Sequence, residues 1–409
     1  MMNSIPTARS AIAPYLGQTT MKKTSRKPGA SALRVKVGPE RIVHTDAIQP
    51  FMFQSSKGTL FNQSQLSFPP GYVSPARNRF PGLPGNVISR DRGATWKLWK
   101  PKPEQGEGPT IEGATVELKD GRILMFDWIA DGPTPEGNFT GRLWESGDDC
   151  ETFDGPMDFN IHLPEARGGF DDAGAPYSGL TFHRSVLQLP SGDLLAVIYC
   201  WFKGDDTPCP YQTKMCKFRT VLIRSSDSGR NWKYVSTVAV GPSIGEEGFD
   251  EPVMIRLTKG PKAGRLLCIM RTGSIECPLY QCVSDDEGKT WSPPRKLEFC
   301  GVDPDLLEMS DGTLVCASGW RCKGWGHADQ YKGKLPPRAC NYIVFSKDHG
   351  ETWSDLTSFP FEPYADPIST YYTTVREIAK GRLLVVYDIG FWLVPLRYVA
   401  SRIVTVKHQ

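Results

Sequence analysis

The sequence predicts an all-β protein, a six-bladed β-propeller of four-stranded antiparallel blades, and two repeated motifs support this prediction. The first motif is Ser-x-Asp-x-Gly-x-Thr-Trp, with a clear copy from Ser284 to Trp291. In the second, a glycine precedes a hydrophobic strand, as in Ser191-Gly192-Asp193-Leu194-Leu195. The chain of 409 residues also contains 40 Gly and 34 Pro, a composition that suits many short strands joined by turns.

The residue types of the first motif explain why it forms a turn. Ser and Asp side chains bond nearby backbone amides, Gly supplies a positive φ angle, and the final aromatic residue packs beneath the hairpin. Further copies begin at Ser89, Ser225 and Ser346, and a weaker copy begins at Ser146, with Cys150 in the Gly position. We expect these five turns to join the third and fourth strands of each unit. They should build the fold and touch no substrate.

The second motif sets the number of units. It occurs six times, around Gly58, Gly121, Gly192, Gly264, Gly312 and Gly381, and each copy is typical of a tight turn between two strands. Six units must pack side by side in a ring to bury their sheet faces. To close the ring, we expect residues 33–37 to pair with residues 402–406 in the last blade.

The termini and composition limit the other classes of function. Residues 1–34 contain no Asp or Glu and are expected to be a disordered leader, or alternatively an organelle transit peptide, ahead of one propeller domain at 35–409. No apolar run approaches a membrane span or a secretory signal, so a cytoplasmic location is favoured over an exported or organellar one. The net charge of +3 does not favour nucleic acid as a partner.

Polar residues stand where the first, channel-lining strand of each unit is expected. They are Gln49, Glu112, His183 and Arg184, Asp250 and Glu251, Asp303 and Asp305, and Tyr371 and Tyr372. Ionisable groups are rarely placed in half-buried strands without a partner, so chemistry is expected here. None of these groups has metal-ligand spacing, and we expect no cofactor.

With these motifs the sequence resembles the sialidase (neuraminidase) superfamily over residues 35–409, and the first motif is that family's Asp box. The resemblance implies a glycoside hydrolase similar to exo-α-sialidases, in which a Tyr nucleophile is activated by a Glu. Glu251, followed by Pro252, resembles the family's Glu. Tyr372, in Tyr372-Thr373-Thr374-Val375, resembles the family's Tyr, and Tyr371 is the competing assignment.

The resemblance also implies a substrate class. The family holds the carboxylate of a terminal, sialic acid-like sugar with three Arg side chains, whose planar forks bind carboxylates with two bonds. Arg271 and Arg321 match the second and third Arg in position along their units. Asp388 resembles the carboxylate that steadies the first Arg. The implied partner is therefore a glycan that carries an acidic sugar.

Two departures from the family pattern leave the sugar and the general acid open. The place of the first Arg reads Ala47-Ile48-Gln49-Pro50, so Arg77, Arg79 or Arg184 would have to replace it. The stretch 61–79, where the family's acid/base Asp should lie, contains no Asp or Glu. The candidates for general acid are His183, Asp127, Asp131, Asp205 and Asp206, and His183, Arg184 and Asp303 are also candidates for substrate binding.

Two alternatives remain open at this point. One is a carbohydrate-active propeller with different chemistry, using His183 and the acids of units two and three on a uronic-acid glycan. The other is a non-catalytic propeller that binds a glycan or a protein. A bond between Tyr372 and Glu251 would favour the sialidase-like reaction. A centre of His183 and Arg184 with Tyr372 turned away would favour the first alternative.

Overall fold

The protein is built from β-strands and their turns. The computed structural model describes residues 33–67, 82–105, 108–109, 113–275, 277–321, 340–359, 369–390 and 397–408. The helical segments in these ranges are two short 3-10 helices, η1 (Pro103–Gln105) and η2 (Gly260–Lys262). No helix in the described ranges is long and apolar enough to cross a membrane. Most of the predicted leader lies outside the described residues, but Leu33 and Arg34 begin strand β1.

Three sheets have the four-stranded form that the repeats predict. The first contains β20 (Asp250–Arg256), β21 (Leu266–Arg271), β22 (Pro278–Ser284) and β23 (Arg295–Cys300). The second contains β24 (Val302–Glu308), β25 (Leu314–Trp320), β26 (Cys340–Ser346) and β27 (Ser354–Phe359). The third contains β28 (Thr373–Ala379), β29 (Arg382–Ile389), β30 (Tyr398–His408) and β1 (Leu33–Thr45). A five-stranded sheet adds β2 (Ala47–Gln54), β3 (Leu60–Ser67), β4 (Gly82–Pro84), β5 (Val87–Ser89) and β6 (Lys97–Leu98).

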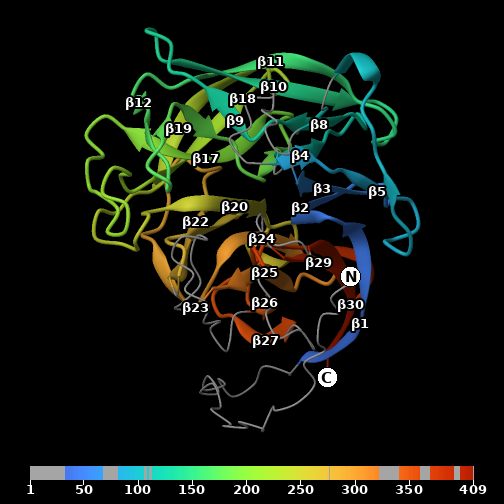
Figure 1. Ribbon diagram of the computed structural model, residues 1–409. Coiled ribbons are helices and arrows are strands. Elements are labelled where there is room, and N and C mark those ends of the chain that lie inside the picture. Colours follow the sequence, from blue (N-terminus) through green and yellow to red (C-terminus); the bar gives the residue numbers. More distant parts are fainter. Residues whose placement is uncertain are drawn as a thin grey trace, which may run out of the picture.

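The two ends of the described chain pair in one sheet, as predicted. Strand β1 runs antiparallel to β30, with Val35 opposite Val406 and Val37 opposite Val404. Figure 1 shows the two strands side by side, in blue and red. This pairing joins the start of the described chain to the last sheet and closes the arrangement.

The prediction of six separate four-stranded blades is not confirmed, because units two and three merge into one sheet of 11 strands. Its strands are β7 (Thr115–Glu117), β8 (Ile123–Phe126), β9 (Ile129–Asp131), β10 (Asn138–Ser146), β11 (Asp154–His162), β12 (Ala166–Arg167), β15 (Gly179–Thr181), β16 (Val186–Gln188), β17 (Leu194–Phe202), β18 (Arg219–Ser225) and β19 (Asn231–Ala239). A separate hairpin pairs β13 (Gly169–Phe170) with β14 (Pro176–Tyr177).

Two extra pairings cause the merger. Strand β11 pairs with β10 and also runs parallel to β19, and β15 bridges β9 and β17. The strands β11, β19, β18, β17, β15, β9 and β10 therefore form a closed circuit, which leaves fewer unpaired strand edges. The hydrophobic cluster of these strands includes Phe126, Phe159, Phe182 and Trp232, whose rings pack against one another.

Strands β2, β20 and β24, the first strands of their units, lie near a common centre (Figure 1). Strand β28 contacts β2 and β24, β24 contacts β20, and β20 contacts β16, which in turn contacts β7. Between β3 and β7, the Gln63 side chain accepts a bond of 2.9 Å from the Gly113 amide. These contacts bring residues from distant parts of the chain to one place.

Both predicted turn motifs are confirmed. The glycines of the second motif all have positive φ angles, from 66° at Gly381 to 100° at Gly264, and lie between the first and second strands. The Asp boxes join the third and fourth strands, and Trp232 of the third box is buried in the core, as predicted for the aromatic plug. In that box, Ser225 donates to Asp227 (2.7 Å) and accepts from the Gly229 amide (2.9 Å).

This bonding predicts the effect of one box substitution. Replacing Ser225 with alanine should reduce the free energy of unfolding by about 1–2 kcal/mol, because the buried Gly229 amide loses its acceptor. Its neighbour Ser226 is exposed, so Ser226→Ala is a matched control that should change stability by less than about 0.5 kcal/mol. Urea unfolding measures both changes. Equal effects of the two substitutions would contradict this account of the box.

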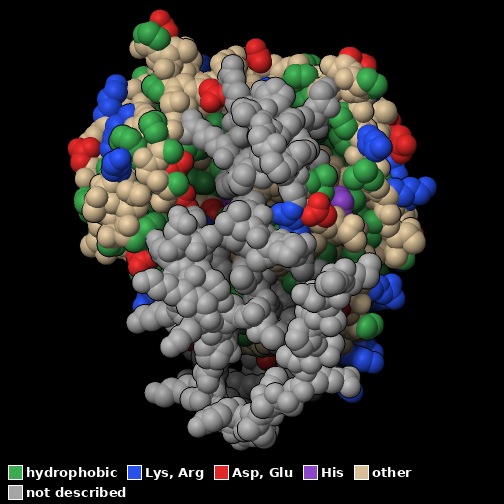
Figure 2. Space-filling view, viewed as in Figure 1, with side chains coloured by type: hydrophobic (Ala, Val, Ile, Leu, Met, Phe, Trp, Pro, Cys, Tyr) green, Lys and Arg blue, Asp and Glu red, His purple; other side chains and the backbone are tan. Residues whose placement is uncertain are grey.

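Charge is mixed over the described surface. Figure 2 shows Lys and Arg side chains interspersed with Asp and Glu side chains on the described part of one face. Such a face produces no strong field of one sign, which agrees with the small net charge. A second set of charged side chains, including Glu251, Arg271 and Asp303, is buried.

Candidate active site

One backbone device recurs at the centre of the protein. Five inner segments each carry a non-glycine residue with a positive φ angle: Gln49 (54°), Arg184 (42°), Glu251 (36°), Asp303 (47°) and Tyr371 (66°). In β2, β20 and β24 the residue lies at a register shift of the strand, which is typical of a β-bulge. Positive φ angles are unfavourable for such residues and cluster at functional sites. A bulge re-aims a side chain, so these segments can present polar groups to one centre.

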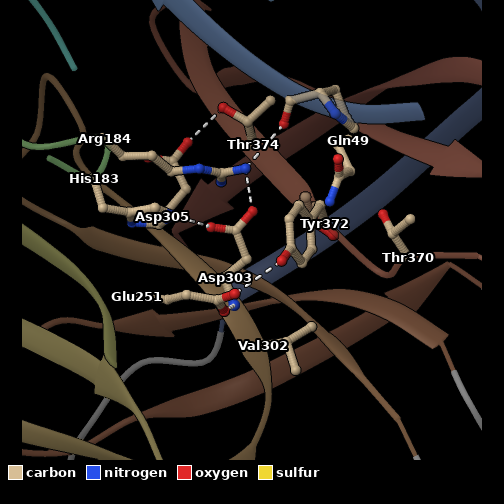
Figure 3. Close-up of polar contacts among 12 residues, drawn as sticks. Gln49, His183, Arg184, Glu251, Val302, Asp303, Asp305, Thr370, Tyr372 and Thr374 are labelled. Carbon is tan, nitrogen blue, oxygen red and sulfur yellow. Dashed lines mark hydrogen bonds and ion pairs between the residues drawn. The ribbon is translucent and has the colours of Figure 1, made fainter. Parts of the chain in front are cut away.

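The predicted base and nucleophile are in contact. The Tyr372 hydroxyl donates a hydrogen bond of 2.8 Å to Glu251 Oε1, although the two residues are 121 positions apart in sequence. Both side chains are buried (Figure 3). Glu251 Oε2 accepts a second bond, of 2.7 Å, from the Asp303 amide. The carboxylate is therefore fixed, with one oxygen directed at the phenol.

Arg271 keeps Glu251 ionised. Its Nη1 donates to Glu251 Oε1 at 2.5 Å. Burial alone raises the pKa of Glu251, but the charge of Arg271 and its hydrogen bond outweigh burial and lower that pKa to about 2. Glu251 is thus a carboxylate at neutral pH, the form that can accept a proton from the Tyr372 phenol.

Two further acidic residues, Glu247 and Asp250, lie beside Arg271. Its Nη2 lies 2.8 Å from Glu247 Oε2, and its Nε lies 3.9 Å from Asp250 Oδ2. Burial raises the pKa of Asp250 well above its usual range, and a hydrogen bond to the neighbouring Glu247 raises it further. The charge of Arg271 is thus shared between the carboxylates of Glu247 and Glu251. Nη1 and Nη2 of Arg271 are both directed at carboxylates of the protein itself.

Two further guanidiniums lie against the phenol ring. The Cζ atoms of Arg184 and Arg321 lie 5.5 Å and 5.7 Å from the centroid of the Tyr372 ring. Nε and Nη2 of Arg321 both donate to the carbonyl of Thr370, at 3.1 Å and 2.6 Å. Burial, together with the nearby charge of Arg271, lowers the pKa of Arg321. Two positive charges therefore lie beside the Tyr372 ring.

His183 and Arg184 converge on the carboxylate of Asp303. His183 Nε2 lies 3.0 Å from Asp303 Oδ1, and Arg184 forms an ion pair with Oδ2. Burial raises the pKa of Asp303, and the charge of Arg184 opposes this rise. Because the Asp303 amide also bonds Glu251, the His183 cluster and the Tyr372 pair belong to one network. The Tyr372 pair, expected for the sialidase-like reaction, and the His183 centre, expected for the reaction on a uronic-acid glycan, therefore do not lie at separate places.

Asp388 is held at the back of this network. It accepts a hydrogen bond of 2.8 Å from the Gln49 amide, one of 2.5 Å from Ser369 Oγ and another from Thr370 Oγ1. Burial raises its pKa. We expected Asp388 to steady the first Arg of the family, and here it instead fixes the backbone of Gln49, which stands in that place.

The structure brings all the candidate site residues together in this network, namely Tyr372, Glu251, Arg271, Arg321, Asp388, His183, Arg184 and Asp303. Of the candidate general acids, only His183 belongs to it. Asp127 instead pairs with Arg142, Asp205 with Arg219 and Asp206 with Arg167, and Asp131 lies on β9. Glu112, Arg77 and Arg79 lie outside the described residues.

Glu247 was missed by sequence reasoning. It lies in the loop before β20, three positions ahead of the inner-strand acids, and no motif marks that loop. The acidic pair Glu246 and Glu247 was the only available signal. Within the described ranges, no three His, Cys, Asp or Glu side chains gather so that they could hold a metal ion.

The pKa of Glu251 predicts how stability changes in acid. In an unfolded chain this carboxyl has a pKa of about 4.3, whereas it is about 2 in the folded protein. The ionised group therefore adds stability that is fully present above about pH 4.3 and lost as the pH falls toward 2. The stability difference between the wild type and Glu251→Gln should narrow over this range. Urea midpoints at several pH values measure it, and a constant difference would contradict the prediction.

Comparison with known proteins places the chain in a family. The family model described as BNR repeat-like domain matches residues 104–370. The repeats and the strand arrangement thus define a BNR-repeat protein, and the chain belongs to the BNR repeat-like domain family. No curated protein matches the chain in sequence.

Solved structures agree with the fold. A Dyadobacter fermentans protein of unknown function is 19% identical, with a TM-score of 0.65 over 91% of this chain and 99% of its own. A Hadza microbial sialidase is 15% identical, with a TM-score of 0.56 over 89% of this chain and 66% of its own. A Penicillium chrysogenum α-L-arabinanase solved with arabinobiose is 16% identical, with a TM-score of 0.57 over 90% of this chain and 98% of its own. The predicted sialidase-like resemblance is confirmed for the fold.

Proposed function

We propose that the protein is a glycoside hydrolase in which Tyr372 attacks the anomeric carbon of a terminal sugar and Glu251 accepts the phenol proton. The observation that carries this proposal is the buried bond of 2.8 Å between the Tyr372 hydroxyl and the ionised Glu251 carboxylate. A neutral phenol is a weak nucleophile until a neighbouring base removes its proton. The pair therefore supplies the group and the activation that the reaction needs.

The reaction has two steps in this proposal. First, the phenol oxygen bonds the anomeric carbon as the leaving group departs, and Glu251 takes the phenol proton. Then water attacks the same carbon and gives one proton to the group that protonated the leaving group, while the Tyr372 oxygen leaves and takes its proton back from Glu251. Of the candidates for protonating the leaving group, His183 is the one in the network, 3.0 Å from Asp303. Two displacements at one carbon retain the anomeric configuration.

An acidic sugar is the first substrate class we propose. Arg184 and Arg321 lie against the Tyr372 ring, where a sugar bonded to that residue would be placed. A carboxylate on such a sugar would be attracted by both positive charges. Arg271, which we first assigned to the substrate carboxylate, is more suited to holding Glu251.

A neutral sugar is the second candidate, and one observation favours it. Gln49 stands where the sialidase-like pattern has its first Arg, so the three-Arg arrangement for a carboxylate is incomplete. The fold is also similar to that of a protein titled α-L-arabinanase and solved with arabinobiose. A uronic-acid glycan and non-catalytic glycan binding are the further alternatives.

The six-bladed ring is part of this proposal. Strands β2, β7, β16, β20, β24 and β28 would be the innermost strands of six blades within one domain at 35–409. Support comes from the contacts that link successive strands from β7 to β2 and from the bond between Gln63 and Gly113. In such a ring the site lies on the axis, where loops from several blades meet.

The test is hydrolysis by the wild-type protein. Aryl glycosides of sialic acid, glucuronic acid and L-arabinofuranose should be compared, with the released sugar followed by proton NMR. We expect release from at least one of them, with the anomeric configuration of the first product retained. Release with inversion would rule out the covalent Tyr372 step, and no release from any of them would favour the non-catalytic alternative.

A further inference from the structure

Gln49 is fixed in the site by its backbone. It lies in the bulge of β2 with a φ angle of 54°, and its amide donates to Asp388 Oδ2 at 2.8 Å. Asp388 is itself held by Ser369 and Thr370. A strained conformation persists only where its surroundings hold it in place. The network therefore sets the direction of the Gln49 side chain.

The side-chain amide of Gln49 is buried without a bond. The residue is 1% exposed, and neither Oε1 nor Nε2 has a hydrogen-bond partner among the described residues. Leaving both ends of a buried amide unbonded is costly, and native proteins rarely do so without a reason. Figure 3 shows this side chain beside Tyr372 and Thr370. Its position next to the proposed nucleophile makes a ligand the natural partner.

We propose that Gln49 binds a hydroxyl group of the sugar seated against Tyr372, and that it selects against a carboxylate at this point. The inference rests on the proposed function, since it places a sugar in this site. An amide offers an NH2 group that donates and a carbonyl oxygen that accepts, and a hydroxyl can bond either of them. A carboxylate only accepts, so it would bond Nε2 and leave Oε1 facing negative charge.

The charges around Gln49 agree with this assignment. The adjacent carboxylate of Asp388 would repel a substrate carboxylate, and it bonds the backbone of Gln49 itself. The guanidiniums nearby are already bonded to the backbone: Arg184 Nη2 donates to the carbonyl of Pro50 at 3.2 Å, and Arg321 donates to the carbonyl of Thr370. A sugar with an acidic group would therefore turn that group toward Arg321 or Arg184 and present hydroxyls to Gln49.

The test is direct binding of two sugars, measured by calorimetry on the folded full chain. The sugars are L-arabinose, which is neutral, and N-acetylneuraminate, which carries a carboxylate. Gln49→Met keeps the length of the side chain and removes its hydrogen bonds, and Gln49→Arg restores the charge of the family pattern. Gln54→Met, at the other end of β2, is the matched control, because Gln54 lies outside the network.

We expect Gln49→Met to weaken binding of the preferred sugar by about tenfold, while Gln54→Met leaves it unchanged. Gln49→Arg should raise the ratio of N-acetylneuraminate binding to L-arabinose binding by at least about tenfold. If the role of Gln49 were merely structural, its substitution would weaken the binding of both sugars equally. The inference is overturned if Gln49→Met binds as the wild type does, if the ratio stays constant in Gln49→Arg, or if the wild type binds neither sugar.

These outcomes separate the inference from the proposed function. If sugar binding depends on Gln49 but no aryl glycoside is hydrolysed, the hydrolase proposal fails and the role of Gln49 stands. If hydrolysis occurs and Gln49→Met has the same kcat/KM and the same preference as the wild type, the role of Gln49 fails and the hydrolase stands.

Discussion

Replacing Tyr372 with phenylalanine is expected to lower kcat by at least about 10³-fold, because the variant has no oxygen to bond the anomeric carbon. The ring and its contacts with Arg184 and Arg321 remain, so KM should change little. The variant should also stay folded, since the substitution removes the hydrogen bond to Glu251 and creates no cavity. Steady-state hydrolysis of the best aryl glycoside measures the effect, with circular dichroism as the check on folding.

Tyr371→Phe is the matched control for this experiment. Tyr371 is also buried and is the competing assignment for the nucleophile, but Glu251 accepts its phenolic bond from Tyr372. We expect Tyr371→Phe to retain kcat within a few-fold. The reverse result, with activity lost in Tyr371→Phe and kept in Tyr372→Phe, would move the nucleophile by one position. Full activity in both variants would remove tyrosine from the mechanism.

The parts of the fold that the sequence predicts depend on local chemistry. An Asp box such as that at Ser225 closes its turn with its own side chains, so the motif determines the structure wherever it occurs. A glycine such as Gly264 marks a turn because only a residue without a Cβ tolerates its φ angle of 100° easily. Repetition then predicts the number of units.

The merger of units two and three depends on contacts that leave no such mark. Strands β9 and β15 have three residues each, too few for an alternating pattern, and their pairing is decided by the folding of the chain between them. The parallel pairing of β11 with β19 joins the outer edges of two units. The sequence of each edge strand gives no sign that the strand pairs with a second partner.

The same distinction applies to the site. Glu251 and Tyr372 could be predicted because Glu251-Pro252 and Tyr372-Thr373-Thr374-Val375 resemble runs of the sialidase family. The role of Arg271 could not, because the Glu247 that shares it comes from a loop without a motif. The bulges were also invisible in sequence, since Gln49 and Asp303 are not residues that mark positive φ angles in the way that glycine does. Position along the repeat indicated which residues lie in the site. Tertiary contacts decide which partner each of them bonds.

Replacing Arg271 with methionine is expected to reduce the free energy of unfolding by about 3–5 kcal/mol at neutral pH, because it leaves buried carboxylates without their counter-charge. The guanidinium lies 2.5 Å from Glu251 Oε1 and 2.8 Å from Glu247 Oε2, and all three side chains are buried. Methionine fills much of the same volume, so the loss reports charge rather than a cavity. Urea unfolding at pH 7 measures it.

Arg224→Met is the matched control, because Arg224 also pairs with two acidic groups, Asp193 and Glu287, but lies partly in solvent. Its effect should stay below about 1 kcal/mol. The destabilisation by Arg271→Met should also shrink at lower pH, since burial without Arg271 favours the protonated carboxyls and acid supplies the protons. If the two variants were equally stable, or if the effect of Arg271→Met did not depend on pH, then Arg271 would not be what keeps Glu251 ionised, and the activation of Tyr372 would need another source.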